Sequence, residues 1–429
     1  MSHIDRLYDT LAATAADFKA AQAPLVTRAE QLSIPTDCVS PDDTNETVRE
    51  LFARNESLET VAVVEQGHPI GLINRNIFME HYARPFARDV FGRKSCIAFM
   101  DKAPVVVDAA TPIEVLVKTA VDAGGRVLKD GFITTAHGQY LGLGTGYGLM
   151  KAMSDIESEK TRQLLSSISY ASLIQRSHLA ESDRVLQAHM PDHGLLWEPR
   201  DVVRGDAYFF RQTADGLLGC IFDCTGHGVP GAFMTLIALS FLEQAIDPAR
   251  NGTDPGATLT AMHRYIQRVL QQRAAAQDGN AAAAKQSSDG LDAALFVLAP
   301  DGRSLRFASA RLSLLVAREG EDSIIQVDGD KAGIGYAETA DDQTWTTRDV
   351  PLGERSVVVV PTDGVIDQIG GPKQIAHGRR RLMQFMADHR GARARTLCQA
   401  FTASFSEWQG TQRRRDDVSL LAFGTGAAA

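Results

Sequence analysis

The spacing of hydrophobic and polar positions divides the N-terminal part of the chain into two similar halves. Residues 61–80 and 132–151 both read as strand, tight turn, strand and helix. Three positions of the two segments fall in register, namely Gly67 with Gly138, Gly71 with Gly142 and Met79 with Met150. An amphipathic helix precedes each segment, with apolar positions at Val48, Leu51 and Phe52 and then at Val115, Leu116 and Ala120. This internal repeat predicts one α/β domain over residues 38–153.

Helical spacing appears at two further places. An apolar-periodic stretch with Leu7, Leu11, Ala15 and Phe18 predicts a helical segment within residues 1–37. A longer pattern over residues 154–190 begins with charged residues and continues as an apolar stripe made of Leu164, Leu165, Ile168, Ala171 and Ile174. We expect this connector helix either to transmit a rotation or simply to pack on its neighbour. The Ala- and Gln-rich stretch 273–290 predicts a mobile loop.

Acidic motifs follow or open the β-rich runs of the C-terminal half. The apolar runs 217–222 and 357–360 end on Asp223 and just before Asp363. Asp206 follows Arg204-Gly205, and Asp416-Asp417 precedes a further apolar run. Aspartate beside glycine is also ordinary turn chemistry. Several aspartates at the ends of buried strands nevertheless predict a shared site for divalent cations, which prefer oxygen ligands.

Composition narrows the class of protein. A chain of 429 residues is too long for one ordinary core, and its 44% hydrophobic and 23% charged residues are typical of a folded protein. The formal charge of -9 makes nucleic acid an unexpected partner. Five cysteines without Cys-x-x-Cys spacing, and no apolar run long enough to span a bilayer, predict a reduced, cytoplasmic protein without a membrane span.

The repeated N-terminal segment, about residues 38–153, resembles a tandem CBS pair. The resemblance rests on the glycine and methionine positions in register and on the helix that precedes each copy. It implies a regulatory domain that binds an adenine nucleotide in the cleft between the repeats. The alternative is a repeat that dimerises or packs on the rest of the protein without any ligand.

The C-terminal motifs resemble the SpoIIE/RsbU branch of the PPM, or protein phosphatase 2C-like, family over residues 191–424. They are Gly205-Asp206, the run from Asp223 to Ala232 (DCTGHGVPGA), Thr362-Asp363-Gly364-Val365-Ile366-Asp367 and Asp416-Asp417-Val418-Ser419-Leu420-Leu421. The resemblance implies an α-β-β-α sandwich of two antiparallel sheets flanked by helices. The whole chain is therefore expected to be an α+β protein with a regulatory domain, a helical connector and a catalytic domain.

The same resemblance implies the catalytic residues Asp206, Asp223, Asp363 and Asp416. Asp223 would bridge two Mn²⁺ or Mg²⁺ ions, the carbonyl of Cys224 would be a further ligand, and Asp363 and Asp416 would complete the site. Asp206 would be a ligand or act through bound water, and Asp417 could exchange roles with Asp416. Water would then attack phosphorus in line without a phosphoenzyme.

Three further residues have open roles. His227 is either a proton donor to the leaving oxygen or a structural residue of its glycine-rich turn. Arg204 stands where the branch usually has glycine, and Arg311 stands where it has a Gly-His pair. Arg204 is interpreted as a phosphate ligand or a solvated side chain, and Arg311 as a phosphate ligand or a surface cation.

These features predict a bacterial serine/threonine protein phosphatase. By analogy with the branch, its substrate would be a phosphorylated STAS-type anti-sigma-factor antagonist of a partner-switching pathway. A homodimer is expected because CBS-like pairs commonly associate and the connector carries an apolar stripe. The main alternative is a catalytically weak, nucleotide-sensing module that docks a signalling partner; hydrolysis of a small phosphate compound is a weaker one.

Overall fold

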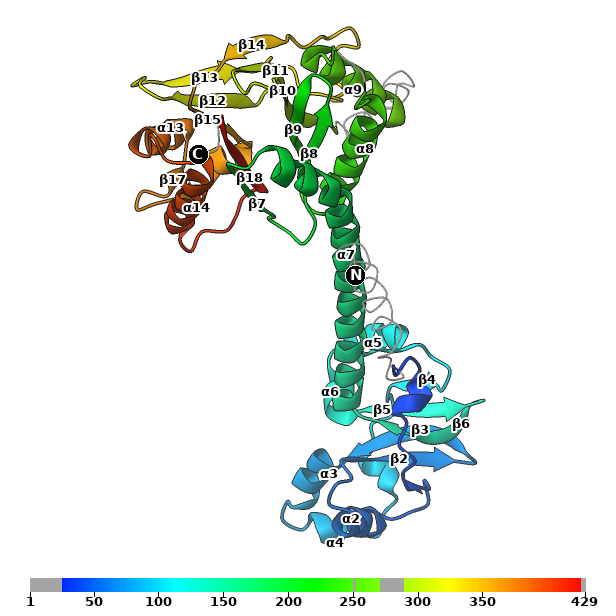
Figure 1. Cartoon of the computed structure of the whole chain (residues 1–429). Helices are drawn as coiled ribbons and strands as arrows, with labels where there is room; N and C mark the ends of the chain where they lie inside the picture. The colour runs from blue at the N-terminus through cyan, green and yellow to red at the C-terminus, as the bar shows by residue number, and fades with distance from the viewer. Residues whose placement is uncertain (1–24, 250–251, 271–288, 426–429) are drawn as a thin grey trace. The chain divides into compact units, whose positions relative to one another are not determined.

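The computed structural model describes residues 25–249, 252–270 and 289–425 (Figure 1). These residues form two compact units, one ending at Ser166 and the other beginning at Ser167. The helix expected around Leu7 to Phe18 lies outside the described residues, and so does the expected loop at 273–290 apart from its last two residues.

The N-terminal unit contains the predicted repeat. The first copy comprises β1 (Cys38–Val39), α2 (Asn45–Arg54), β2 (Thr60–Glu65), β3 (His68–Asn74) and α3 (Arg75–Tyr82). The second comprises β4 (Val106–Asp108), α5 (Ile113–Asp122), β5 (Phe132–Ala136), β6 (Gln139–Gly144) and the beginning of α7 (Gly146–His189). The connections contain η1 (Ala29–Leu32), α4 (Ala87–Phe91), η2 (Cys96–Phe99) and α6 (Arg126–Asp130).

The two copies share their strand register as well as their element order. Each forms a three-stranded sheet whose first strand runs parallel to the second and whose second runs antiparallel to the third. A bulge falls at the corresponding place in both, after Val63 and after Thr134. The two sheets join through a buried apolar cluster of Ala62, Leu72, Ile133 and Leu143. Four residues in register in the sequence therefore become one shared core.

The helix that closes the second copy is continuous with the predicted connector. We expected the connector at residues 154–190, but α7 begins at Gly146 and continues to His189. No glycine or proline occurs between Gly148 and Pro191 to interrupt it. The helix ends shortly before Pro191, whose missing N–H and ring disfavour a continued helix.

The C-terminal unit is a sandwich of two five-stranded antiparallel sheets. In spatial order, the first sheet contains β14 (Arg348–Pro351), β11 (Ser304–Ala310), β10 (Leu291–Leu298), β9 (Gly216–Cys224) and β8 (Asp206–Thr213). The second contains β13 (Ile324–Asp328), β12 (Ser313–Arg318), β15 (Ser356–Pro361), β18 (Val418–Thr425) and β7 (His193–Glu198). A short hairpin of β16 (Ile369–Gly370) and β17 (Ile375–Ala376) follows β15.

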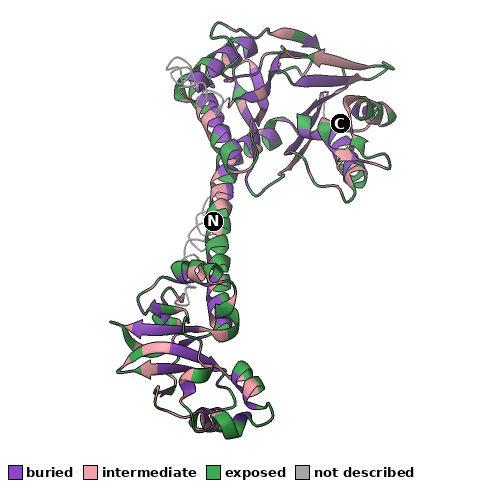
Figure 2. Ribbon diagram, turned by 180° about the vertical axis from the view of Figure 1, so that it is seen from behind, coloured by how far each residue is buried: buried purple, intermediate pink, exposed green. Residues whose placement is uncertain are grey.

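Helices cover the outer face of each sheet. The first sheet is covered by α8 (Val229–Ala245) and α9 (Pro255–Leu270), and the second by α13 (Arg379–Asp388) and α14 (Ala394–Gln409) (Figure 1). Between the sheets, Phe296 of β10 stacks on Phe423 of β18 with ring centroids 5.1 Å apart. The buried residues concentrate on the strands and on the helix faces turned towards them (Figure 2). The α-β-β-α sandwich and the α+β class are therefore confirmed.

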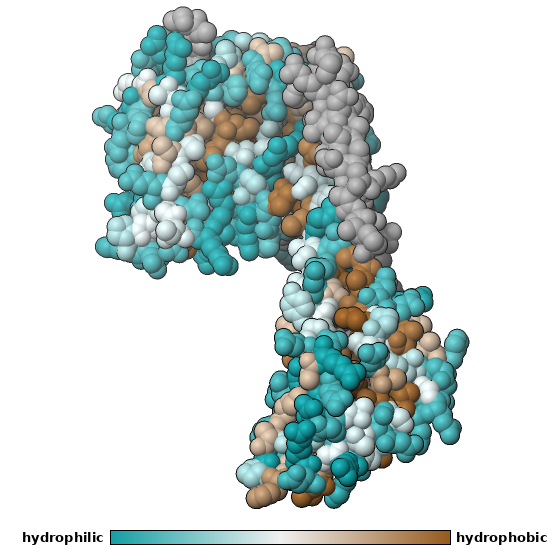
Figure 3. Space-filling view, turned by 90° about the horizontal axis from the view of Figure 1, so that it is seen from below, coloured by the Kyte–Doolittle hydropathy of each residue, from teal (hydrophilic) through white to brown (hydrophobic). Residues whose placement is uncertain are grey.

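The surface drawn in Figure 3 is mostly hydrophilic, with apolar side chains in small patches. Exposed large apolar residues include Leu164 and Leu165 of the predicted connector stripe. None of the helices in the described part of the chain is both long and apolar enough to span a bilayer.

Candidate active site

Two buried strands bring the first two predicted carboxylates together. β8 begins at Asp206, β9 ends one residue after Asp223, and the antiparallel register pairs these two residues. Directly opposed residues on neighbouring strands carry their side chains on the same face of a sheet. Asp206 is buried, Asp223 is half-buried, and their carboxyl groups lie against each other.

Asp363 approaches the same place from the second sheet. It begins the short helix α12 (Asp363–Asp367), two residues after β15 ends, and its carboxyl group contacts that of Asp223. A Cβ added to Gly364 would lie 1.8 Å from the carbonyl oxygen of Asp417. Glycine at this position therefore allows the turn to approach β18 closely enough to deliver Asp363 to the end of β9.

The two aspartates before β18 have different surroundings. Asp417 is buried, and its carboxylate accepts main-chain hydrogen bonds from Gly205 at 2.5 Å, Arg200 at 2.6 Å and Asp206 at 3.4 Å. Asp416 is half-buried, and one of its oxygens accepts the N–H of Asp417 at 2.9 Å. Asp417 therefore holds the loop that leads into β8, whereas Asp416 keeps an oxygen for another partner.

One carboxylate of this region was not predicted. Asp292 of β10 is the direct cross-strand partner of Asp223, so Asp206, Asp223 and Asp292 form a row across three neighbouring strands. The signal was present in the sequence, because Asp292 is the one charged residue in the apolar run 291–298. The acidic cluster is defined as Asp206, Asp223, Asp292, Asp363 and Asp416.

Burial raises the pKa of several carboxyls in the acidic cluster. It is the largest cause for Asp206, whose pKa rises to about 7 although the Ser419 and Thr362 hydroxyls oppose the change. The pKa of Asp223 is raised well above its usual value by burial and then by the charges of Asp206 and Asp363. Burial also raises the pKa of Asp292 to about 6, against the effect of Arg311. Burial, together with the charges of neighbouring carboxylates, therefore opposes full ionisation of the cluster.

The donor chemistry of the acidic cluster suits a hard divalent cation, which takes oxygen ligands. As the side chains stand, however, no group of three His, Cys, Asp or Glu residues in the described part of the chain is arranged to hold an ion. Asp363 is exposed and Asp416 half-buried, so both can turn without disturbing the core. Cys224 can offer only its carbonyl, because its thiol is buried and accepts a hydrogen bond from Thr235 at 3.8 Å.

The structure contradicts one of the two interpretations of Arg204, namely that its side chain is solvated. Only 6% of it is exposed, and its guanidinium lies 3.7 Å from the ring centroid of Trp197. Its Nε and Nη1 atoms have no hydrogen-bond partner within the described residues. Gln175 of α7 binds its main chain on both sides, donating to its carbonyl at 2.6 Å and accepting from its N–H at 3.1 Å. Coverage by α7 and β7 explains the burial.

His227 lies at the edge of the acidic cluster with a partner that the sequence did not reveal. Its Nδ1 is 2.7 Å from a carboxylate oxygen of Asp201, and both side chains are 45% exposed. The charge of His227 also acts on Asp416, which places the ring near that carboxyl group. Asp201 belongs to the loop before β8, where no sequence pattern distinguishes it from a surface residue.

Arg311 lies beside the acidic cluster. It forms an ion pair of 3.3 Å with Asp292 and is 38% exposed, so it is neither remote from the site nor fully solvated. The structure thus brings Asp206, Asp223, Asp363, Asp416 and Arg311 to one end of the sandwich and adds Asp292 to them.

Comparisons with known proteins find relatives of both units. The profile of the family described as Stage II sporulation protein E (SpoIIE) matches residues 213–425, and the CBS domain profile matches residues 32–84. The SiaA-PP2C domain of Pseudomonas aeruginosa is 34% identical, with a TM-score of 0.53 over 62% of this chain and 98% of that one. No curated protein matches the chain in sequence.

Two structures with lower sequence identity match a smaller part of the chain. The PP2C phosphatase domain with a regulatory-domain fragment of SpoIIE from Bacillus subtilis is 14% identical, with a TM-score of 0.43 over 56% of this chain and 64% of that one. The RsbU and RsbW domains of a Mycobacterium tuberculosis protein are 20% identical, with a TM-score of 0.42 over 56% and 63%.

The Pseudomonas match covers nearly the whole of that domain, and the SpoIIE profile includes every residue of the acidic cluster except Asp206. The fold and the order of the motifs point the same way. The chain therefore belongs to the SpoIIE family of PP2C-type phosphatases and carries a CBS domain in its N-terminal unit.

Proposed function

We propose that this chain is a metal-dependent serine/threonine protein phosphatase of bacterial signalling. The observation that carries the proposal is the meeting of Asp206, Asp223 and Asp363 where β8, β9 and α12 converge. Carboxyls gathered so closely repel one another and bind a divalent cation favourably. Membership of a phosphatase family supplies the reaction class.

Two Mn²⁺ or Mg²⁺ ions are proposed to bind here. Asp223, Asp363 and Asp416, with the carbonyl of Cys224, would hold them. Asp206 is buried and already accepts a hydrogen bond from Thr362 at 2.8 Å, which favours a role through Asp223 or water over direct ligation. Bound ions would neutralise the phosphoryl oxygens and make a water molecule more acidic. Asp417 would keep the Gly205-Asp206 turn in place through its three main-chain hydrogen bonds.

His227 is proposed to donate the proton that the departing Ser or Thr oxygen needs. The Asp201 carboxylate binds the Nδ1 side of the ring, which leaves Nε2 for the substrate. The exposure of the ring is compatible with access by a protein substrate. A purely structural His227 would affect folding instead of the protonation of the leaving group.

Regulation is assigned to residues 38–153 and transmission to 154–190, with catalysis in 191–424. A cavity of about 360 Å³ in the N-terminal unit is lined mainly by the first copy and the connection that follows it, including Leu72, Asn74 and Phe99, and Asp130 joins it from the second half. Asn74 donates a hydrogen bond to Asp130 at 2.7 Å across the repeats. Apolar walls and carboxylates suit an adenine ring and ribose hydroxyls, so we place the adenine nucleotide there.

The remaining assignments concern partners and compartment. The substrate is proposed to be a phosphorylated STAS-like protein, and the protein to be a cytoplasmic homodimer. All five cysteines are free, which suits a reducing compartment, and the exposed Leu164 and Leu165 of α7 suit pairing with a second copy. A mass measurement in solution tests the dimer. The alternative is a nucleotide-sensing docking module with little turnover that binds a signalling partner.

The test is phosphate release from a phosphoserine protein and from an aryl phosphate, with Mn²⁺, with Mg²⁺ and with a chelator. Release by the full chain should require the metal and should fall at least a hundredfold in Asp223→Asn and Asp363→Asn. Asp349→Asn, on an exposed position of β14, is the matched control and should keep full activity. Turnover that survives in Asp223→Asn, or none in the wild type, would reject the proposed enzyme.

A further inference from the structure

Arg311 is held in an unusual backbone conformation beside the acidic cluster. It lies between β11 and β12, where the chain passes from one sheet to the other, and its φ is 64°. An L-residue in this left-handed region costs about 1–2 kcal/mol. The turn is fixed because the N–H of Arg311 donates to the carbonyl of Asp330 at 2.8 Å. Strain of this kind is often kept where it places a functional side chain.

The strand register aligns Arg311 with the carboxylate row. Ala310 and Ala293 form the last pair between β11 and β10, and Arg311 follows this pair beside Asp292. Asp292 pairs in turn with Asp223. Asp292 therefore stands between Arg311 and Asp223.

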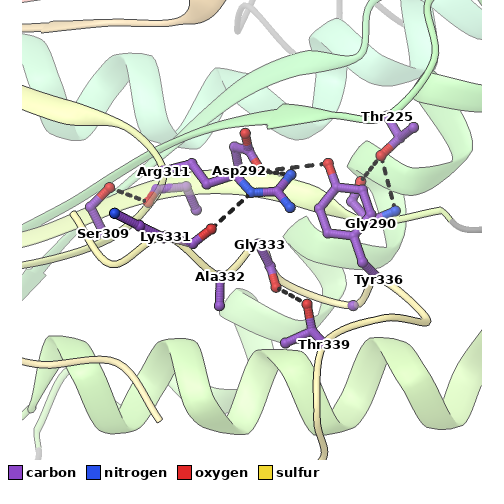
Figure 4. Close-up of polar contacts among 12 residues, drawn as sticks. Thr225, Gly290, Asp292, Ser309, Arg311, Lys331, Ala332, Gly333, Tyr336 and Thr339 are labelled. Carbon is purple, nitrogen blue, oxygen red and sulfur yellow. Dashed lines mark hydrogen bonds and ion pairs between the residues drawn. The ribbon is translucent and has the colours of Figure 1, made fainter. Parts of the chain in front are cut away.

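Three contacts fix the guanidinium (Figure 4). Its Nη1 donates to Asp292 Oδ1 at 3.3 Å, and its Nε donates to the carbonyl of Lys331 at 3.2 Å. Its central carbon lies 4.6 Å from the ring centroid of Tyr336, whose hydroxyl donates to the same Asp292 oxygen at 3.4 Å. A Cβ on Gly333 would lie 2.3 Å from the Tyr336 ring and 3.0 Å from that guanidinium carbon. The group is therefore pre-positioned by close packing.

These contacts leave part of the guanidinium available. Its Nη2 makes no hydrogen bond within the described residues, and 38% of the side chain is exposed. The 3.3 Å separation from Asp292 is longer than the roughly 2.7–2.9 Å of a strong charge-assisted bond. The planar guanidinium matches the oxygens of a phosphate better than the point charge of lysine does.

We propose that Arg311 binds the phosphoryl oxygens of a phosphate monoester substrate, and that Asp292 and Tyr336 position its guanidinium. The inference rests on the proposed phosphatase function. It identifies Arg311 as the cationic side chain that binds the phosphate group of the substrate. A phosphate dianion beside several carboxylates is repelled unless positive charge faces it. Arg311 supplies that charge from the side of β10, and the end of β9 lies on the other side of the phosphate.

The test compares phosphate binding in matched arginine variants of the full chain. The affinity of the Mn²⁺-loaded protein for inorganic phosphate is measured by calorimetry, and KM and kcat are measured with an aryl phosphate. Arg311→Gln should weaken phosphate binding and raise KM by roughly ten- to a hundredfold, and Arg311→Lys should lose less. Arg306→Gln is the control, because Arg306 lies on β11, the strand that leads to Arg311, pairs with Asp215 at 3.3 Å and is 33% exposed.

The outcomes separate this inference from the proposed function. A folded Arg311→Gln that binds Mn²⁺ and phosphate like the wild type overturns the role of Arg311, whether or not the chain is an enzyme. Phosphate binding that depends on Arg311 without turnover keeps that role and rejects the phosphatase. A wild type that neither binds phosphate nor turns over rejects both. If Arg311→Gln does not fold, unchanged phosphate affinity in Arg311→Lys overturns the inference.

Discussion

Asp416 and Asp417 are neighbours in sequence with opposite expected effects on substitution. Asp417 accepts three main-chain N–H groups, and its loss would leave buried donors unpaired. Asp417→Ala should therefore lower the free energy of unfolding by about 2–4 kcal/mol. Asp416→Ala should leave stability within about 1 kcal/mol and abolish metal-dependent turnover. Urea denaturation and phosphate release distinguish the two variants. Equal losses of stability in Asp416→Ala and Asp417→Ala would contradict the different roles of these residues.

The raised pKa of Asp206 predicts a pH effect on the metal-free protein. A carboxyl whose pKa rises to about 7 on folding binds its proton more tightly in the native state. The resulting stability is fully present below the unfolded pKa of about 3.9 and is lost as pH rises through about 7. In the presence of a chelator, we measure the free energy of unfolding of the wild type minus that of Asp206→Asn. This difference should be larger at about pH 5 than at about pH 8 by a few kcal/mol. A difference in unfolding free energy that stays constant across this pH range would contradict the raised pKa of Asp206.

At the residue scale, sequence reasoning finds what motifs encode and misses what only packing decides. Asp206 begins an apolar strand, Asp223 lies at the end of one and Asp363 follows one, so their convergence could be predicted. Asp292 has no glycine beside it, and only strand pairing shows that it joins them. The burial of Arg204 depends on Trp197, which is close in sequence but belongs to a strand of the other sheet.

At the element scale, α7 packs directly against the strand that begins with Asp206. Gln175 binds the main chain of Arg204, Ser182 accepts the N–H of Phe210 at 3.1 Å, and Asp183 accepts the Tyr208 hydroxyl at 2.7 Å. These residues are spaced so that one face of the helix follows β8. The placement of Asp206 therefore depends on α7.

Gln175→Ala tests this dependence. Loss of two buried hydrogen bonds should lower the free energy of unfolding by about 1–3 kcal/mol and should reduce kcat, because the turn before Asp206 loosens. Gln187→Ala, at an exposed position on the same helix, should change neither quantity. Thermal or urea unfolding with parallel turnover assays measures both effects. A kcat for Gln175→Ala equal to that of the wild type would show that α7 does not position the active site.

The elements themselves were predictable where the apolar period was strong. The repeat, the strands at 217–222 and 357–360 and the helical pattern before Met190 all appear in the structure. The helix that ends the second repeat and the connector were expected as separate elements, whereas both belong to α7, which begins at Gly146. There Gly146 makes close contact with α6, and a Cβ would lie 2.6 Å from the Cα of Leu128.

At the scale of the whole molecule, the two units carry different chemistry. The acidic cluster lies in the unit that begins at Ser167, and the cavity lined by Leu72, Asn74 and Asp130 lies in the unit that ends at Ser166. Both units could be recognised because a repeat and an order of motifs are signals along the sequence. Metal binding and ligand binding can accordingly be measured as separate properties of the full chain.

The central claim is that the acidic cluster is a metal site, and titration of the full chain with Mn²⁺ by calorimetry tests it most directly. The account predicts two bound ions for the wild type, loss of both in Asp223→Asn because this carboxylate contacts two others, and two retained in Asp349→Asn. A wild type that binds no Mn²⁺, or an Asp223→Asn variant that binds it equally well, would contradict the account.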